Sequence, residues 1–360
     1  MAFIRNLGAI LSFQKFYIIP NFNGTIVTTF FKSIPVLIFL SLAVNDIIYV
    51  LTTKKMSPLY DISSLADIVS RLELLISRLA FILIFLIGIK YNTQHLYLIS
   101  CLVEFENSLE QTFQVRRKKS KILRSNVDIS VTIAFNFILY LNFFYVTSSV
   151  INIEAIIAFI NQIIILIAND VIVLYVIHIM KELQEFSGIL CRCGKLNNYA
   201  SFKVIMKIFE LPYSINSALA GMLFVSFIQH MGSSALVSYF VFWIGFGTGW
   251  FPEKIFFLIA CGIWFLRNIF SIIYLTIVGH RLTHRFQDVM KLLANQEERF
   301  HLVEFNKKQV QLWLSHLEHK TILAGSIEIT NEGFFSILSF TTTCLIILLQ
   351  FKQLEDSDGS

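Results

Sequence analysis

Residues 321–351 read TILAGSIEITNEGFFSILSFTTTCLIILLQF. The second half of this stretch, from Gly333 to Leu349, carries no charged side chain. Because an α-helix rises about 1.5 Å per residue, that half is long enough to cross most of a hydrocarbon core about 30 Å thick. The stretch therefore predicts a membrane-spanning helix, which we place at residues 326–351.

Polar side chains follow one face of this expected helix. Thr343, Ile347 and Gln350 fall on that face, and Ser336 continues it toward the start of the helix. An amide at the end of a span needs water or a protein partner, so the face is expected to meet protein or a water-filled path. The alternative is that Gln350 lies at the membrane interface while the threonines bond to their own helix.

The whole chain has the composition of a membrane protein. It contains 360 residues, of which 56% are hydrophobic and 36 are phenylalanine, whereas soluble proteins average about 45–50% apolar residues. The net charge of +5 does not indicate a nucleic-acid partner, because the basic residues lie between apolar segments, where they can meet anionic membrane lipid. No cleavable signal peptide is expected, since Arg5 and Lys15 interrupt the apolar N-terminal run.

Apolar segments of suitable length predict an all-α, polytopic membrane protein with seven transmembrane helices. The expected spans lie at about 33–52, 74–90, 128–148, 155–180, 214–246, 254–279 and 326–351.

The links between these spans predict the orientation of the chain. Links 91–127, 181–213 and 280–325 are rich in Lys and Arg, and all three lie on the same side of the membrane. The positive-inside rule makes that side cytoplasmic. The N-terminus is then cytoplasmic and the C-terminus extracellular, which is opposite to a G-protein-coupled receptor.

Two charged residues inside the expected spans need an explanation. Asp170 lies in the fourth span and Arg267 near the middle of the sixth. An unpaired charge at the centre of a bilayer costs at least about 2.5–3.5 kcal/mol, so we expect the two to form a buried charge pair or to share water in a cavity. A purely structural bridge is the alternative to a functional one.

A ligand pocket is expected among the outer halves of the second to sixth spans, since such cavities are lined by aromatic side chains with a few polar groups. Helix packing or an interfacial position is the alternative reading of each candidate. The candidates are Tyr140, Asn142, Tyr145, Asn161, Gln162, Tyr239, Trp243 and Trp264, together with Arg78.

Catalytic and metal-binding patterns are weak in this sequence. His280 and His284 are spaced to bind zinc on one helix face, but no carboxylate or third histidine accompanies them at helical spacing. Cys191 and Cys193 offer only two thiols, too few for a closed site. There is no Walker loop, nucleophile elbow or dinucleotide fingerprint. We therefore expect no metal, no cofactor and no enzymatic activity.

The closing residues resemble the signature of the insect gustatory receptor family. Thr343 and Cys344 are followed by five apolar residues and then by Gln350 and Phe351. This order is similar to the Thr-Tyr, five-hydrophobic, Gln-Phe signature that closes those receptors. Cys344 departs from it by standing where the family has tyrosine. The motif falls at the end of the last expected span, as it does in the family.

The resemblance implies a ligand-gated, non-selective cation channel built as a homo- or heterotetramer, in which each subunit gives its last helix to a shared pore. It implies that Gln350 and Phe351 form the gate, with Thr343 and Ile347 lining the path below. The implied partners are a small-molecule tastant, sister subunits and membrane lipid, with no nucleic acid. The implied location is the plasma membrane of gustatory neurons.

The implied domain organisation follows the spans. Residues 1–279 form a cytoplasmic N-terminal segment and a six-helix membrane domain with the ligand pocket. Residues 280–325 form a cytoplasmic helical anchor for subunit assembly, 326–351 the pore helix and 352–360 an extracellular tail. From the residues alone, the apolar face that includes Phe286 could equally be covered by the membrane surface or by sister subunits.

The short, phenylalanine-rich chain looks most like a member that senses bitter or aversive compounds. The alternatives are a sugar-sensing member, an auxiliary subunit of a heteromeric taste receptor, and a G-protein-coupled-like seven-helix receptor.

Overall fold

The protein is almost entirely helical. The computed structural model describes residues 26–52, 64–115, 130–139, 141, 153–193, 199–247, 254–297, 322–325 and 327–358. The elements are α3 (Ile26–Thr52), α4 (Ser64–Lys90), α5 (Asn92–Phe113), an unlabelled helix (Ser130–Leu139), α7 (Ile153–Cys193), α8 (Tyr199–Phe242), the π-helix η2 (Trp243–Gly247), α9 (Lys254–Glu297), β1 (Leu323–Ala324), β2 (Ile327–Glu328) and α11 (Asn331–Asp358).

Five helices in the described part of the chain are long and apolar enough to cross a membrane: Leu65–Lys90, Ile160–Cys193, Lys203–Phe246, Lys254–Leu292 and Asn331–Leu354. Two shorter apolar helices, Leu40–Thr52 and Ser130–Leu139, overlap the first and third expected spans. A multi-pass, nearly all-helical architecture is thus confirmed. The count of seven crossings and the orientation of the termini stay predictions.

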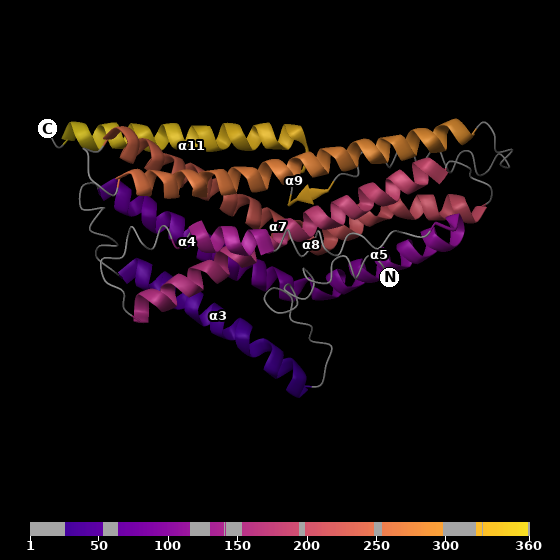
Figure 1. The fold of residues 1–360 in the computed structure, drawn as a ribbon, viewed down its shortest axis with the longest axis horizontal. Coiled ribbons are helices and arrows are strands. Elements are labelled where there is room, and N and C mark those ends of the chain that lie inside the picture. Colours follow the sequence, from indigo (N-terminus) through magenta and orange to yellow (C-terminus); the bar gives the residue numbers. More distant parts are fainter. Residues whose placement is uncertain are drawn as a thin grey trace.

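Three helices run far beyond the spans expected from hydropathy. Helices α7, α8 and α9 contain 41, 44 and 44 residues, whereas about 20 residues are enough to cross a bilayer. Figure 1 shows the end of α7, the start of α8 and the end of α9 gathered with α5 at one end of the molecule, away from the C-terminal end of α11. These extensions form a helical layer continuous with the membrane bundle.

Helix α5 lies within the link that the sequence analysis placed at residues 91–127. Leu98, Leu102, Phe105 and Leu109 recur every three or four residues and are buried, and α5 packs against α8. Part of the basic link is therefore an integral element of the bundle. Mean hydropathy did not reveal it because its outer face is polar.

The neighbour of the apolar face on α9 lies in the same subunit. Phe286 and Val289 are buried in the main hydrophobic cluster, and the ring of Phe286 lies 5.8 Å from that of Phe209 on α8. Neither the membrane surface nor a sister subunit is needed to cover these two side chains. Helix α9 is continuous across residue 280, so the membrane domain and the proposed anchor share one helix.

A buried histidine holds α5 against α7. His95 Nε2 lies 3.2 Å from the hydroxyl of Tyr175, and burial lowers the pKa of His95 from 6.5 to about 4. Because the folded pKa lies below the unfolded one, the unfolded chain binds more protons between about pH 4 and 6.5. The contribution of His95 to folding stability therefore falls as the pH drops through that window, by about 2 kcal/mol at pH 5.

We expect His95→Gln, which keeps a polar atom near the Tyr175 hydroxyl, to remove most of this acid sensitivity. The measurement is thermal unfolding of the purified chain in detergent at pH 7.5 and pH 5.0. His284→Gln is the matched control for replacing a histidine, since His284 is exposed, and it should leave the acid sensitivity that comes from His95 in place. An equal loss of stability on acidification in His95→Gln and the unaltered chain would contradict the assignment.

A two-stranded hairpin connects the bundle to the last helix. Strands β1 and β2 pair antiparallel, with Ala324 opposite Ile327. Leu323 N donates to Asn216 Oδ1 on α8 at 2.9 Å, and Gly325 N donates to Ala220 O at 3.0 Å. Two backbone N–H groups of the hairpin therefore hydrogen-bond it to α8.

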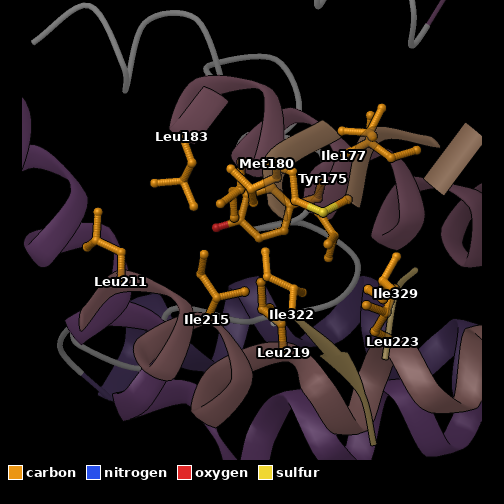
Figure 2. Packing of buried hydrophobic residues seen from close by; sticks show 14 of the residues in the cluster. Tyr175, Ile177, Met180, Leu183, Leu211, Ile215, Leu219, Leu223, Ile322 and Ile329 are labelled. Atoms are coloured by element: carbon orange, nitrogen blue, oxygen red, sulfur yellow. The ribbon is translucent and has the colours of Figure 1, made fainter. Parts of the chain in front are cut away.

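Apolar side chains of the hairpin complete the main core. Figure 2 shows Ile322 and Ile329 beside Leu219 and Leu223 of α8, with Tyr175 of α7 nearby. All five side chains are buried. The base of the last helix is thus anchored in the centre of the subunit.

The last helix begins five residues later than predicted. Gly325 has a φ of +64°, a left-handed conformation that glycine adopts without the strain of a Cβ, and the chain turns there. Helix α11 starts at Asn331, where Thr330 Oγ1 accepts a hydrogen bond from Gly333 N at 3.3 Å as a helix cap. Residues 327–330 are therefore a strand and a bend and not the start of the helix, because Ile327 and Glu328 form β2, which pairs with β1, and Thr330 caps the helix that follows.

Helix α11 lies along α8 and α9 at the edge of the bundle (Figure 1). Its packed stripe includes Thr341, Leu345 and Leu348, of which the two leucines contact an aromatic cluster of α8 and α9. Most of the other described side chains of α11 are exposed. This helix is the least buried of the five candidate spans, with 6% of its most apolar window buried inside the subunit.

Candidate functional site

A buried ion pair joins α7 and α9. Arg267 Nη2 lies 2.7 Å from Asp170 Oδ1, and Arg267 Nε donates to Asp170 Oδ2 at 3.2 Å. Both side chains are buried. Two parallel charge-assisted hydrogen bonds are the strongest arrangement available to a guanidinium and a carboxylate. The structure thus brings together the two charges that the sequence analysis singled out.

Polar groups from further helices complete this ion pair. Asn136, on the helix Ser130–Leu139, donates through Nδ2 to Asp170 Oδ2 at 2.8 Å. His230 on α8 places Nε2 3.7 Å from Asp170 Oδ1. Arg267 Nη1 donates to the side-chain oxygen of Asn268 at 3.3 Å. The site therefore ties the helix Ser130–Leu139 and α8 to the pair between α7 and α9.

The hydrogen-bonded chain continues to a third buried ionisable side chain. Asn268 Nδ2 donates to Ser233 Oγ at 3.1 Å, and Ser233 Oγ donates to Glu73 Oε1 at 3.1 Å. Glu73 lies on α4 and is 7% exposed. A connected polar path therefore crosses the bundle from Asp170 to Glu73.

A second ion pair lies between α3 and α4. Arg78 Nη2 lies 3.1 Å from Asp46 Oδ2, and Asn161 Nδ2 on α7 donates to the same oxygen at 2.7 Å. Asn161 and Arg78 were both candidates for the ligand pocket. In this structure their polar atoms hold the carboxylate of Asp46.

The other pocket candidates separate into three groups. Tyr239, Trp243 and Trp264 gather in one buried aromatic cluster of α8, η2 and α9. Gln162 on α7 is fully buried, and within the described residues neither its amide oxygen nor its nitrogen has a hydrogen-bond partner. Tyr140, Asn142 and Tyr145 lie outside the described residues.

Two cavities lined by described residues touch the polar path. The larger, which we call the Asp170 cavity, has a volume of about 210 Å³ and lies between the helix Ser130–Leu139, α7 and α9. Asp170 and Arg267 contribute its charged wall. The smaller, which we call the Glu73 cavity, has a volume of about 40 Å³ and lies among α4, α8 and α9, with Trp264 in its wall.

The four residues expected at the pore lie on exposed parts of α11. Thr343, Ile347, Gln350 and Phe351 are all exposed. Thr343 Oγ1 donates to the backbone oxygen of Ser339 at 2.9 Å, as hydroxyls in membrane helices commonly do. The face that carries Thr343, Ile347 and Gln350 is turned away from the packed stripe, and so from the subunit's own bundle.

Metal ligands are sparse in the described residues. His280 Nε2 and His284 Nε2 lie 3.0 Å apart on α9. No group of three or more His, Cys, Asp or Glu side chains in the described part of the chain is arranged to hold a metal ion.

The sequence analysis missed Glu73 because the second span was drawn from residue 74. Helix α4 begins ten residues earlier, at Ser64, which places Glu73 well inside it. One signal was available: Asp67 and Arg71 are spaced four residues apart, and they form an ion pair of 2.7 Å along the helix. Such a pair stabilises the helix that carries it, so a helix starting before residue 74 could have been expected.

The structure is similar to solved structures of an insect olfactory receptor. Receptor OR5 from Machilis hrabei in complex with eugenol matches with a TM-score of 0.63 and 11% sequence identity, over 96% of this chain and 97% of that chain. A second structure of the same receptor matches with a TM-score of 0.66 and 10% identity, over 96% and 97% of the two chains. No protein-family model and no curated protein matches the sequence. The likeness shows that the chain has the fold of this receptor.

Proposed function

We propose that the chain is a chemoreceptor subunit that assembles with sister subunits into a ligand-gated, non-selective cation channel. The observation that carries the proposal is the fold, which is shared over 96% of the chain with an insect olfactory receptor. The terminal motif at residues 343–351 supports it, because it lies on a helix that its own subunit leaves largely uncovered. Seven crossings, with the N-terminus cytoplasmic and the C-terminus extracellular, belong to this proposal.

The pore is assigned to α11. Repeating this helix around an axis would bring Thr343, Ile347 and Gln350 together along a central path. Phenylalanine rings at Phe351 can close a narrow pore by excluding water, and amide oxygens at Gln350 can contact a cation without the tight coordination that selectivity needs. Between Ser336 and Gln350 the face has no acidic side chain, which favours weak selectivity.

The proposed ligand is a small organic molecule, and a bitter or aversive tastant is the class we favour. The similar olfactory receptor is described in complex with eugenol, itself a small organic molecule. The gustatory assignment rests on the terminal motif. The pocket is assigned to the polar and aromatic residues between α4, α7, α8 and α9, and residues 280–325 to subunit assembly.

We expect Phe351→Ala to raise the current that flows without ligand several-fold, because four missing rings let water enter the constriction. The measurement is whole-cell current in cells expressing the full chain, before and after addition of cation-channel blockers. Phe335→Ala is the matched control, since Phe335 is also exposed on α11 but lies two turns before the motif, and it should leave the resting current low.

Labelling of terminal tags tests the orientation in the same cells. A tag fused after Ser360 should be labelled without permeabilisation, and a tag at Met1 should not. Labelling of the Met1 tag alone would place the motif in the cytoplasm and overturn the channel assignment. If the Ser360 tag alone is labelled and Phe351→Ala still leaves the resting current unchanged, the assignment of Phe351 to the gate is wrong.

A further inference from the structure

The Glu73 cavity combines a buried carboxylate with an aromatic wall. Glu73 and Ser70 come from α4, Phe240 from α8, and Phe257 and Trp264 from α9. The volume of about 40 Å³ is roughly three times the 10–15 Å³ that one water needs. The cavity can therefore take a small polar head group with the first atoms attached to it.

Glu73 has unused capacity to accept hydrogen bonds. Its Oε1 accepts one from Ser233 Oγ at 3.1 Å, and this is the one hydrogen bond that Glu73 makes within the described part of the chain. An ionised carboxylate can accept about four. The remaining acceptor positions belong to a side chain that lines the cavity, so Glu73 in its ionised form presents negative charge to the contents of the cavity.

The arginines near Glu73 are already neutralised by other carboxylates. Arg78 and Arg267 are the cations whose charge acts on Glu73. Arg78 pairs with Asp46 at 3.1 Å, and Arg267 with Asp170 at 2.7 Å. Among the described residues of this part of the bundle, the carboxylates of Asp46, Asp170 and Glu73 therefore share the guanidinium groups of Arg78 and Arg267, and Glu73 is the acid that neither arginine pairs with directly.

His230 does not supply the missing cation. Its Nε2 lies 3.7 Å from Asp170, and its Nδ1 contacts Asn268 at 3.2 Å. A proton on this ring would strengthen the contact with Asp170, which Arg267 already pairs, and would leave Glu73 as it is. A buried carboxylate without a partner is costly, and a cation that comes from outside the chain would remove this cost by pairing with Glu73.

The wall of the cavity selects the kind of cation. Trp264, Phe240 and Phe257 are each at most 5% exposed, and aromatic faces attract ammonium groups, tryptophan most strongly. Calcium takes six to eight oxygen ligands, whereas Glu73 and Ser70 are the side chains with oxygen atoms in this wall. The chemistry therefore fits an organic ammonium better than a metal ion.

We propose that the Glu73 cavity binds the ammonium group of an organic amine, with Glu73 as the counter-ion and Trp264, Phe240 and Phe257 as the surrounding wall. This inference rests on the proposed function, because it names the chemical class of the ligand that the receptor senses. A neutral compound of the same shape would leave the charge of Glu73 without a partner and would bind more weakly.

The test compares n-butylamine with 1-butanol, which have the same carbon chain and differ in the charged group. Dissociation constants are measured by ligand-observed NMR on the purified full chain in lipid nanodiscs at pH 7.4, where the amine is protonated. We expect the amine to bind at least ten-fold more tightly than the alcohol. Glu73→Gln should remove that difference by weakening the amine and leaving the alcohol unchanged.

Glu104→Gln is the matched control. Glu104 is exposed and pairs with Lys207 at 2.7 Å on the surface, so its loss should not change amine binding. An equal effect of Glu104→Gln and Glu73→Gln would overturn the proposal by showing that the amine binds through overall charge. Equal affinity of the unaltered chain for amine and alcohol would also overturn it, even if Glu73→Gln failed to fold.

The binding measurement separates this inference from the proposed function. Selective amine binding without amine-evoked current would support the cavity and contradict the channel. Currents evoked by neutral compounds, with no preference for the amine in binding, would support the channel and overturn the amine assignment.

Discussion

Replacing Asp170 with leucine is expected to destabilise the folded chain by about 3–5 kcal/mol, the usual cost of breaking a buried ion pair. The guanidinium of Arg267, buried on α9, would lose its carboxylate partner at 2.7 Å. The amide of Asn136 would lose its acceptor as well. Arg267→Met should cost a similar amount, because it leaves the buried carboxylate of Asp170 without its cation.

The double variant Asp170→Leu/Arg267→Met should recover much of the loss, since two apolar side chains of similar volume often replace a buried ion pair at little cost. The measurement is thermal unfolding of purified protein in detergent, together with the amount of protein at the cell surface. Arg285→Met is the control: Arg285 and Asp288 form an exposed pair on the same helix at 3.6 Å, worth about 0–1 kcal/mol. A double variant no more stable than the worse single variant would show that the two residues act independently.

Replacing Gly279 with alanine is expected to displace the hairpin that anchors the last helix. An added Cβ on Gly279 would lie 2.4 Å from the backbone oxygen of Ile329 and 2.7 Å from its Cγ2. Ile329 N donates to Ile322 O at 3.0 Å, and both side chains are buried in the main core. The contact is with backbone, so it cannot be relieved by rotating a side chain.

We expect Gly279→Ala to cost about 1–3 kcal/mol of stability, the usual penalty of overpacking, and to impair ligand-evoked current because the base of α11 moves. Gly262→Ala is the matched control on the same helix, where an added Cβ meets no atom within 4 Å. That change should stabilise the helix by up to about 1 kcal/mol. If Gly279→Ala proved as stable as Gly262→Ala in thermal unfolding, α9 and the hairpin could not be packed as closely as described.

Hydropathy predicted the helical class of the chain and the approximate place of each described apolar helix. It failed at the boundaries, because α7, α8 and α9 continue as helices beyond the expected spans, where packing between helices stabilises them. Phe286, for example, is covered by Phe209 of the same subunit. The hairpin at 323–328 was also missed, since its two strands contain two residues each and are held by contacts to α8.

The candidate site was foreseen in part. Asp170 and Arg267 stand out in sequence because each is a charge inside an apolar segment, and the cost of an unpaired charge makes a partner necessary. Glu73 did not stand out, because it lies among Asp67 and Arg71 near the start of its helix. The aromatic residues Tyr239, Trp243 and Trp264 were named as candidates, but the polar path that links their helices to Asp170 was not.

By itself, the sequence determined that this chain is a multi-pass helical protein, that its buried charges need partners, and that its last helix carries a terminal motif on one polar face. These follow from local quantities: apolar length, helical periodicity and the cost of a charge in lipid. The tertiary structure alone decided which groups meet. Glu73 and Ser233 are separated by 160 residues and Arg267 and Asp170 by 97, and such distant pairings depend on how whole helices pack.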